Sequence, residues 1–252
     1  MRTLVTIPVH NEAARIVPNA LLLEECLREA HQEHVLAIVE DGSTDGTVQQ
    51  VQRLKGQVDN LLIQSLAYRS GRGAALRKLW KTQDFDAYCY VDADLPAGPE
   101  AVLAAIHALE TGADVAIGSR YCRGARVKRP PLVKFMSRRY NQLIRAVFRD
   151  GIYDHQCGLK AIRRDALNDL LDQIGDNSWF WDTELVVRGK REGYQVAELP
   201  LDWVETRNRK TSVGRLAGEI PYFLSNIVRL SGQLRGSLPI SGGTTEFEHP
   251  TP

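Results

Sequence analysis

The chain has 252 residues, 43% of them hydrophobic, and a formal net charge of +1, which suits one large soluble α/β domain, with two small domains as the alternative. A run of about 18 uninterrupted apolar residues, as a transmembrane helix requires, does not occur, and the N-terminal residues do not match a signal peptide. The four cysteines include no CxxC pair, which predicts reduced thiols in a cytoplasmic protein and excludes a disulfide or zinc framework.

The first half of the chain alternates between strand-like and helix-like segments. Apolar runs predict strands over residues 3–9, 35–41, 60–66, 86–94 and 113–120, and helical spacing predicts helices over 20–32, 45–57, 73–83 and 98–112. Continuous apolar strands that alternate with helices predict an α/β fold, with a mostly parallel sheet and helices on both of its faces.

The second half is less regular and is strongly basic near its start. Amphipathic spacing predicts helices over residues 132–148, 182–192 and 215–235, with a break at Pro221. Residues 115–149 contain ten Arg or Lys and no Asp or Glu, so the remaining residues carry a formal net charge of −9. This asymmetry indicates a partner that carries phosphate. The first of these helices either packs against the sheet or lies in a membrane interface, with its arginines toward anionic headgroups.

Polar clusters follow the predicted strands at their carboxyl ends, where ligands bind in parallel α/β sheets. HNE follows the first strand, EDGSTDGT the second, DAD the fourth and GSR the fifth. Asp92 and Asp94 are one residue apart, and side chains i and i+2 of an extended segment point the same way. Both carboxylates can then reach one Mg²⁺ or Mn²⁺ ion, whose shell water and a diphosphate complete. The alternative is a solvated turn that caps the helix at 98–112.

Two further motifs precede helices. In VEDGSTDGT (39–47), Glu40 and Asp41 end a buried strand, which simple turn chemistry does not explain. In SGRGAALRKL (70–79), the glycines either cradle a phosphate at a helix N-terminus or allow close backbone packing, and packing is the favoured interpretation. The segment matches neither the GxGxxG pattern of dinucleotide sites nor the P-loop pattern.

Together these motifs resemble family 2 glycosyltransferases of the GT-A fold, and most closely their polyprenyl-phosphate (dolichol-phosphate) mannosyl- and glucosyltransferase branch. The resemblance covers residues 4 to about 215 through the blocks IPVHNEAARI, VEDGSTDGT, GRGAAL, YVDADLP, IGSRY, DHQCGLKAIRRDA, WFWDTEL and ELPLDWVET…RKTS. It implies a Rossmann-like GT-A glycosyltransferase domain over residues 1–214. An amphipathic C-terminal helical segment (215–236) and a disordered tail (237–252) complete the expected organisation.

The resemblance also implies roles for individual residues, since the family's early blocks hold base and ribose and its acidic block holds metal and diphosphate. The residues expected to bind the nucleotide sugar are Pro8, Asn11, Glu12, Asp41, Ser43, Gly71, Gly73, Asp92 and Ala93. Asp92 and Asp94 are also expected to bind Mg²⁺ or Mn²⁺. Matching blocks and positive charge indicate the candidates for binding an acceptor phosphate, which are Ser119, Arg138, Arg139, Lys160, Arg207, Lys210 and Ser212. The candidates for catalysis are Asp182, Glu184 and Arg120.

The implied chemistry is an inverting transfer of a hexose, mannose or glucose, from a GDP- or UDP-linked sugar by in-line displacement at the anomeric carbon. The metal would neutralise charge on the leaving diphosphate. A polyprenyl phosphate acceptor is largely a dianion near pH 7 and needs positive charge rather than a base. A hydroxyl acceptor needs a base, for which Asp182 is the best candidate. The alternative role of Asp182 is to cap the helix at 182–192.

The sequence departs from the family pattern in ways that leave the donor and the acceptor open. Pro96 stands where many mannosyl members have Gln, Glu40 stands where Asp is commoner, and the transmembrane helices of some members are absent. One alternative is a soluble family 2 enzyme that acts on a saccharide or small-molecule hydroxyl. Another is a non-enzymatic nucleotide- or nucleic-acid-binding protein, although no aromatic residues interleave the basic ones, so we expect no nucleic acid partner. We expect a cytoplasmic protein, either free or peripheral on the cytoplasmic face of the membrane; the oligomeric state is open.

Overall fold

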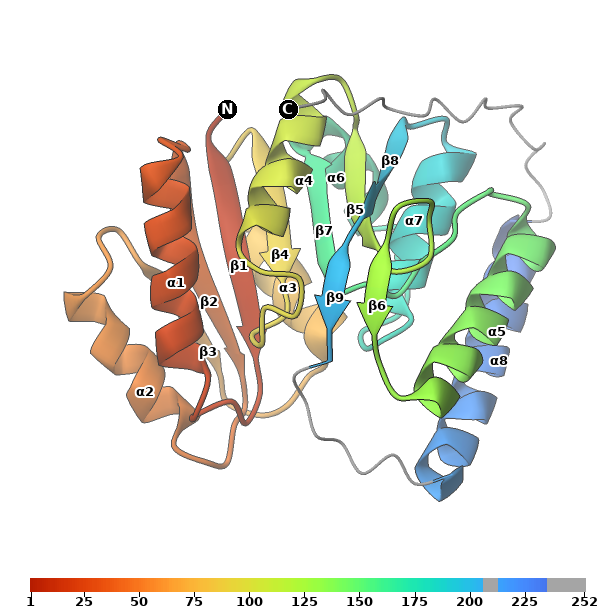
Figure 1. The fold of residues 1–252 in the computed structure, drawn as a ribbon, viewed down its shortest axis with the longest axis horizontal. Helices are drawn as coiled ribbons and strands as arrows, with labels where there is room; N and C mark the ends of the chain where they lie inside the picture. Colours follow the sequence, from red (N-terminus) through yellow and green to blue (C-terminus); the bar gives the residue numbers. More distant parts are fainter. Residues whose placement is uncertain (206–212, 235–252) are drawn as a thin grey trace.

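A computed structural model of the chain describes residues 1–205 and 213–234, without the side chains of residues 213–217. Its centre is a seven-stranded sheet in the order β3-β2-β1-β4-β7-β5-β8 (Figure 1). The strands are β1 (Thr3–Val9), β2 (His34–Asp41), β3 (Leu62–Leu66), β4 (Ala87–Val91), β5 (Val115–Ser119), β7 (Leu159–Arg163) and β8 (Val196–Pro200). A separate ribbon pairs β6 (Arg126–Lys128) with β9 (Asp202–Val204).

The sheet is parallel except for β7, which lies antiparallel between β4 and β5. The register places Leu159, the first residue of β7, opposite Val91, the last residue of β4. The segment that enters β7 therefore lies at the same edge of the sheet as the carboxyl ends of the parallel strands. The predicted mostly parallel sheet is confirmed, and the antiparallel strand is the exception to it.

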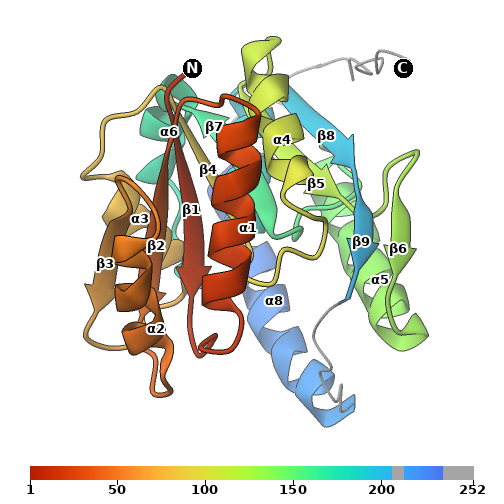
Figure 2. The same cartoon turned by 60° about the vertical axis from the view of Figure 1, so that its left-hand side comes forward.

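Helices cover both faces of the sheet (Figures 1 and 2). Residues of α1 (Ile16–Glu29), α2 (Thr47–Arg53) and α4 (Glu100–Glu110) join one hydrophobic cluster. Those of α3 (Arg72–Trp80), α6 (Arg164–Leu171) and α7 (Trp181–Arg191) join the cluster on the opposite face. A single 3₁₀ turn, η1 (Leu54–Gly56), follows α2.

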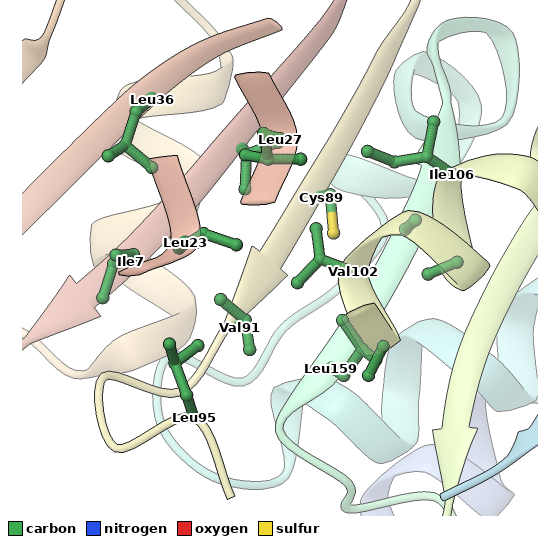
Figure 3. Close-up of a cluster of buried hydrophobic side chains, with 14 of the residues drawn as sticks. Ile7, Leu23, Leu27, Leu36, Cys89, Val91, Leu95, Val102, Ile106 and Leu159 are labelled. Carbon is green, nitrogen blue, oxygen red and sulfur yellow. The ribbon is translucent and has the colours of Figure 1, made fainter. Parts of the chain in front are cut away.

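Each strand of the sheet contributes side chains to both clusters, since successive side chains of a strand point to opposite faces. In β1, Val5 and Ile7 belong to the first cluster and Leu4 to the second. Figure 3 shows Ile7 converging with Leu23 of α1 and Val91 of β4. The apolar segments recognised in the sequence are therefore the ones that build the core.

Two long helices, α5 (Pro131–Phe148) and α8 (Val213–Leu234), lie side by side next to the sheet (Figure 1). Tyr140 of α5 meets Phe223 of α8, with ring centroids 5.0 Å apart. The predicted break at Pro221 is wrong, because α8 continues through this residue. The next two residues, Tyr222 and Phe223, pack against the cluster shared by α5 and α8, and such tertiary packing works against the local cost of an interior proline, about 3 kcal/mol.

The other predicted elements are confirmed with shifted ends. The helix expected at 20–32 begins at Ile16, and the strand expected at 86–94 ends at Val91. No helix among the described residues is both long and apolar enough to cross a membrane. The tail predicted over 237–252 lies outside the described residues, and the division of the chain near residue 214 stays a prediction.

Gly73→Ala should lower the free energy of unfolding by about 1–3 kcal/mol, because overpacking strains a filled core. A Cβ at residue 73 would stand 2.5 Å from the ring of Trp181, whereas one at Gly232 of α8 would meet nothing within 4 Å. Gly232→Ala is the matched control and should raise the same free energy by up to about 1 kcal/mol. Denaturant unfolding measures both; a neutral Gly73→Ala would contradict the close packing of α3 on α7.

Candidate active site

Two loops at the carboxyl ends of β1 and β2 are tied to each other. The backbone N–H of Asn11 donates to Ser43 Oγ at 3.0 Å, and Asn11 Oδ1 accepts the N–H of Thr44 at 2.9 Å. Asn11 has a φ of 57°, a left-handed conformation that asparagine tolerates better than most residues. The structure therefore brings together Asn11 and Ser43, both predicted to bind the nucleotide.

Asp41 links the end of β2 to the loop before α3. Its carboxylate accepts hydrogen bonds from the N–H of Ser70 at 2.6 Å, the hydroxyl of Ser70 at 2.8 Å and the N–H of Gly71 at 2.9 Å. Gly71 has a φ of +97°, and a Cβ there would overlap the backbone of Asn177. Both glycines of this loop thus serve close packing, and the loop lies beside the predicted nucleotide site.

Three further predicted residues line this region through backbone contacts. Pro8 is half-buried in β1, and buried Glu12 donates its N–H to Thr47 Oγ1 at 2.8 Å. The carbonyl oxygen of Ala93 accepts a hydrogen bond from Asn19 Nδ2 at 2.7 Å. The loops after β1, β2 and β4 are therefore held by contacts with α1 and α2.

Asp92 and Asp94 lie in a turn and not in the extended segment that the sequence predicted. The strand ends at Val91, the carbonyl of Asp92 accepts the N–H of Leu95 at 3.0 Å, and Leu95 has a φ of 40°. The premise that both side chains point the same way along a strand is wrong. Asp92 keeps its place because its N–H donates to the Gly158 carbonyl at 2.9 Å and its carboxylate fills the space of a Gly158 side chain.

An arginine that the sequence analysis did not select lies beside these carboxylates. Arg72 Nη1 is 3.1 Å from Asp92 Oδ1, and its Nη2 forms an ion pair with Asp182. The guanidinium carbon lies 4.6 Å from the ring centroid of Trp179 and 5.4 Å from that of Tyr90. Arg72 therefore connects α3 with the end of β4 and the first turn of α7. Its only sequence signal is its place between the two glycines of GRG.

Asp182 is a fully buried member of the same cluster. Its carboxylate accepts a hydrogen bond from Tyr90 and lies 3.6 Å from the ammonium of Lys160. It does not cap α7, because Asp176 Oδ1 accepts the Trp181 N–H at 3.0 Å instead. The alternative interpretation of Asp182 as a helix cap is therefore wrong.

Lys160 enters this cluster from the antiparallel strand β7. It is 1% exposed, and its ammonium donates to the carbonyl of Cys157 at 2.8 Å. Burial, together with the positive charges of Arg72 and Arg120, lowers the pKa of Lys160 to about 7. In this arrangement the amino group of Lys160 points into the fold and does not reach the surface.

Arg120 is engaged in a buried bidentate ion pair. Its Nε and Nη2 lie 2.6 and 2.8 Å from the two carboxylate oxygens of Asp154. Burial alone raises the pKa of Asp154, but the charge and hydrogen bonds of Arg120 hold it below its ordinary value. Beside it, the buried Ser119 hydroxyl accepts the N–H of Cys122 at 3.0 Å. Both residues thus fix the loop after β5.

Glu184 faces α8 and not the strand ends. Its carboxylate accepts hydrogen bonds from Arg188 Nε at 2.9 Å and from Arg229 Nη2 at 2.6 Å. Burial raises the pKa of Glu184, but the hydrogen bonds of these arginines bring it below its ordinary value. The structure therefore does not bring Glu184 together with Asp92 and Asp182.

The remaining acceptor candidates divide between α5 and residues outside the described ones. Arg138 and Arg139 are exposed on α5, Arg138 over the ring of Tyr121 and Arg139 over the ring of Phe135. Tyr121 also lies beneath the guanidinium of Arg120, so Arg138 neighbours the loop after β5. The candidates outside the described residues are Arg207, Lys210 and Ser212.

The donor set suits a hard divalent cation that arrives with a diphosphate. Among the described residues, no group of three or more His, Cys, Asp or Glu side chains could hold a metal alone. Mg²⁺ is commonly bound by one or two carboxylates, with phosphate oxygens and water completing its shell. Asp92 and Asp94 are carboxylates of the type that such an ion takes, and Gly158 leaves room for the Asp92 carboxylate at the strand end.

Sequence comparisons identify a family and several relatives. The family model described as Glycosyl transferase family 2 matches residues 4–171. The chain is 34% identical over 214 residues to glycosyltransferase AglD of Haloferax volcanii, covering 84% of this chain but only 34% of that protein. It is 29% identical over 223 residues to polyprenol monophosphomannose synthase of Mycolicibacterium smegmatis, covering 86% of this chain and 82% of that protein. A dolichyl-phosphate beta-glucosyltransferase of Trichomonas vaginalis is 28% identical over 226 residues, with coverages of 84% and 66%.

The structural comparison identifies the same fold. The crystal structure of glucosyl-3-phosphoglycerate synthase from Mycobacterium tuberculosis with UDP matches with a TM-score of 0.71 at 19% identity, covering 95% of this chain and 82% of that one. Another crystal structure of that synthase contains Mn²⁺ and UDP together. The mostly parallel GT-A-like architecture is thus confirmed, whereas the chain spans about a third of the length of AglD.

The free energy of unfolding should rise between about pH 7 and pH 10, because the unfolded chain then binds a proton at residue 160 that the folded protein does not. This window follows from the pKa of Lys160, lowered to about 7 by burial. Lys160→Met should remove the rise. Urea unfolding of both proteins across this range measures it, and parallel pH profiles would contradict a neutral buried lysine.

Proposed function

Because the chain belongs to glycosyl transferase family 2, in the branch of the polyprenyl-phosphate sugar transferases, we propose that it transfers a hexose from a nucleoside-diphosphate sugar to a polyprenyl phosphate, with inversion at the anomeric carbon. Family membership makes the chain a glycosyltransferase, and the non-enzymatic alternative is set aside. The named relatives use mannose and glucose, so the donor in this proposal is a GDP- or UDP-linked hexose.

The donor would lie across the carboxyl ends of β1, β2 and β4. The polar groups of Asn11, Asp41 and Ser43, with the Gly71 loop, would face base and ribose. Asp92 and Asp94 would hold Mg²⁺ or Mn²⁺, which neutralises charge on the leaving diphosphate when bound. Arg72, which contacts Asp92 at 3.1 Å, would add a second positive charge near the same oxygens.

The observation that carries the choice of acceptor is the burial of Asp182. Its carboxylate is 0% exposed and is shared by Arg72, Lys160 and Tyr90. A general base must reach the proton it removes, directly or through one water. A sugar hydroxyl would need such a base, whereas a phosphate acceptor brings its own charge. The engaged state of Asp182 therefore favours the phosphate.

Helix α5 carries accessible positive charge next to exposed apolar side chains. Arg138 and Arg139 share this helix with exposed hydrophobic residues, and α8 beside it exposes more. These residues are Leu132, Phe135, Leu143 and Val147 of α5 and Ile220, Leu224 and Val228 of α8. An apolar face flanked by arginines suits the interface of an anionic membrane. This surface supports the proposal of a peripheral protein on the cytoplasmic face of the membrane, where α5 would hold the acceptor phosphate with Ser119 nearby.

Asp92→Asn and Asp94→Asn should each reduce sugar transfer at least about 100-fold, because the leaving diphosphate loses its metal. Both variants should retain the wild-type melting temperature within a few degrees, since Asn has nearly the shape and volume of Asp and fills the same space. Asp59→Asn, at an exposed position before β3, removes an equal charge and should leave the rate unchanged. Full wild-type activity in EDTA would contradict this metal site.

Replacing Arg138 and Arg139 together by Ala should raise the KM for polyprenyl phosphate about tenfold or more, because two surface charges that attract the anion are lost. Sedimentation with liposomes containing anionic lipid should fall, while the Kd of the sugar nucleotide should change less than about twofold. The control replaces Arg53 and Lys55 by Ala. Both are exposed, at the end of α2 and in η1, and α2 lies at the opposite end of the molecule from α5 (Figure 1). Equal losses in both double variants would show a general charge effect and remove α5 from the acceptor site.

A further inference from the structure

The segment that joins α6 to α7 is held from two sides. On the side of α3, Arg77 Nη2 donates to the carbonyl of Ile174 at 2.6 Å, and Asn177 accepts hydrogen bonds from Arg77 Nη1 at 3.0 Å and from the Ala74 N–H at 3.1 Å. The helix that carries Arg72 is therefore bonded directly to the residues before α7. The opposite side of this segment faces α8.

On the side of α8, Tyr222 makes two hydrogen bonds to this segment. Its hydroxyl donates to the carboxylate of Asp176 at 2.8 Å and accepts the N–H of Phe180 at 3.0 Å. Asp176 Oδ1 in turn accepts the N–H of Ser178 at 2.7 Å and that of Trp181 at 3.0 Å. The N-terminus of α7 is thus capped by a carboxylate that α8 orients.

A second contact between these helices lies one turn further along α7. Glu184 is 0% exposed, and Arg188 of its own helix and Arg229 of α8 both bind its carboxylate. A buried carboxylate without such partners would be strongly destabilising, which fixes the spacing of the two helices here. Asp182 stands between these two anchors, one residue after Trp181 and two before Glu184.

We propose that α8 is a positioning element for the active site, and that it acts through a latch made of the pairs Tyr222–Asp176 and Arg229–Glu184. The latch sets the position of Asp182, which forms an ion pair with Arg72 and so determines where the guanidinium lies beside Asp92. The residues of this latch lie beyond the family match, which ends at residue 171. The inference rests on the proposed function in assigning Arg72 and Asp92 to the diphosphate of the donor.

The experiment compares Tyr222→Phe and Arg229→Lys with Arg191→Met. Arg191 also joins α7 to α8, through a hydrogen bond of 2.7 Å to the Leu234 carbonyl, but at the far end of α7. Tyr222→Phe should lower kcat about tenfold, because small displacements of charged groups in an active site are costly. Its KM for the sugar nucleotide should change less than about twofold, and Arg191→Met should leave both constants within about twofold.

Two readouts separate positioning from a general loss of stability. In the background of Arg72→Gln, Tyr222→Phe should lower kcat less than about twofold, because effects that share one partner are not additive. Hydrogen exchange of ligand-free protein should accelerate at residues 176–184 in Tyr222→Phe and Arg229→Lys, but not in Arg191→Met. An unchanged kcat in both latch variants, or a full additional loss in the Arg72→Gln background, would overturn the proposal.

The rate is measured as Mn²⁺-dependent release of nucleoside diphosphate from UDP-glucose or GDP-mannose, with and without polyprenyl phosphate. If the wild type releases nucleoside diphosphate at the same rate with and without the lipid, the proposed acceptor is wrong. The latch is then still tested on the same reaction. If the lipid accelerates release and kcat with lipid is the same in the wild type and the latch variants, the acceptor stands and the latch is wrong.

Discussion

Arg72 lies between the carboxylates of Asp92 and Asp182 and thereby joins α3 to the end of β4 and the first turn of α7. It brings a positive charge to the tip of β4, where two aspartates would otherwise repel each other. Its aromatic neighbours Tyr90 and Trp179 limit its position. Because ion pairs in partly buried surroundings depend strongly on geometry, every element that touches Arg72 or its partners influences how the strand end meets a diphosphate.

The antiparallel strand β7 makes this arrangement possible. Its entry places Gly158 against Asp92 and Lys160 near Asp182, so β7 shapes the surroundings of both carboxylates. Further along the sheet, Arg120 and Asp154 form a buried bidentate ion pair. The buried guanidinium of Arg120 is thus committed to a carboxylate, whereas Arg138 and Arg139 of α5 are exposed to an anionic acceptor.

The sequence was sufficient for the elements whose local pattern agrees with their tertiary role. Apolar runs located the five strands of the first half, and the strand-end rule brought Asn11, Ser43 and Asp41 to one edge. The strand β7 was not predicted, since LKAIR is short and carries two basic residues in five, and nothing in it marks its direction. Arg72 and Glu184 show the same limit: a charged residue on a helix gains its role from partners distant in the chain, 20 residues from Arg72 to Asp92 and 45 from Glu184 to Arg229.

The claim at the centre of this account is that a buried, engaged Asp182 goes with an acceptor that needs no base. Mass spectrometry tests it most directly: the chain is incubated with Mn²⁺, a panel of UDP- and GDP-sugars and a mixture of saccharides and small alcohols, with and without polyprenyl phosphate. The account predicts a polyprenyl phosphate that carries one hexose, formed from one of these donors only when lipid is present. A glycosylated saccharide or small-molecule alcohol as the sole product would contradict it.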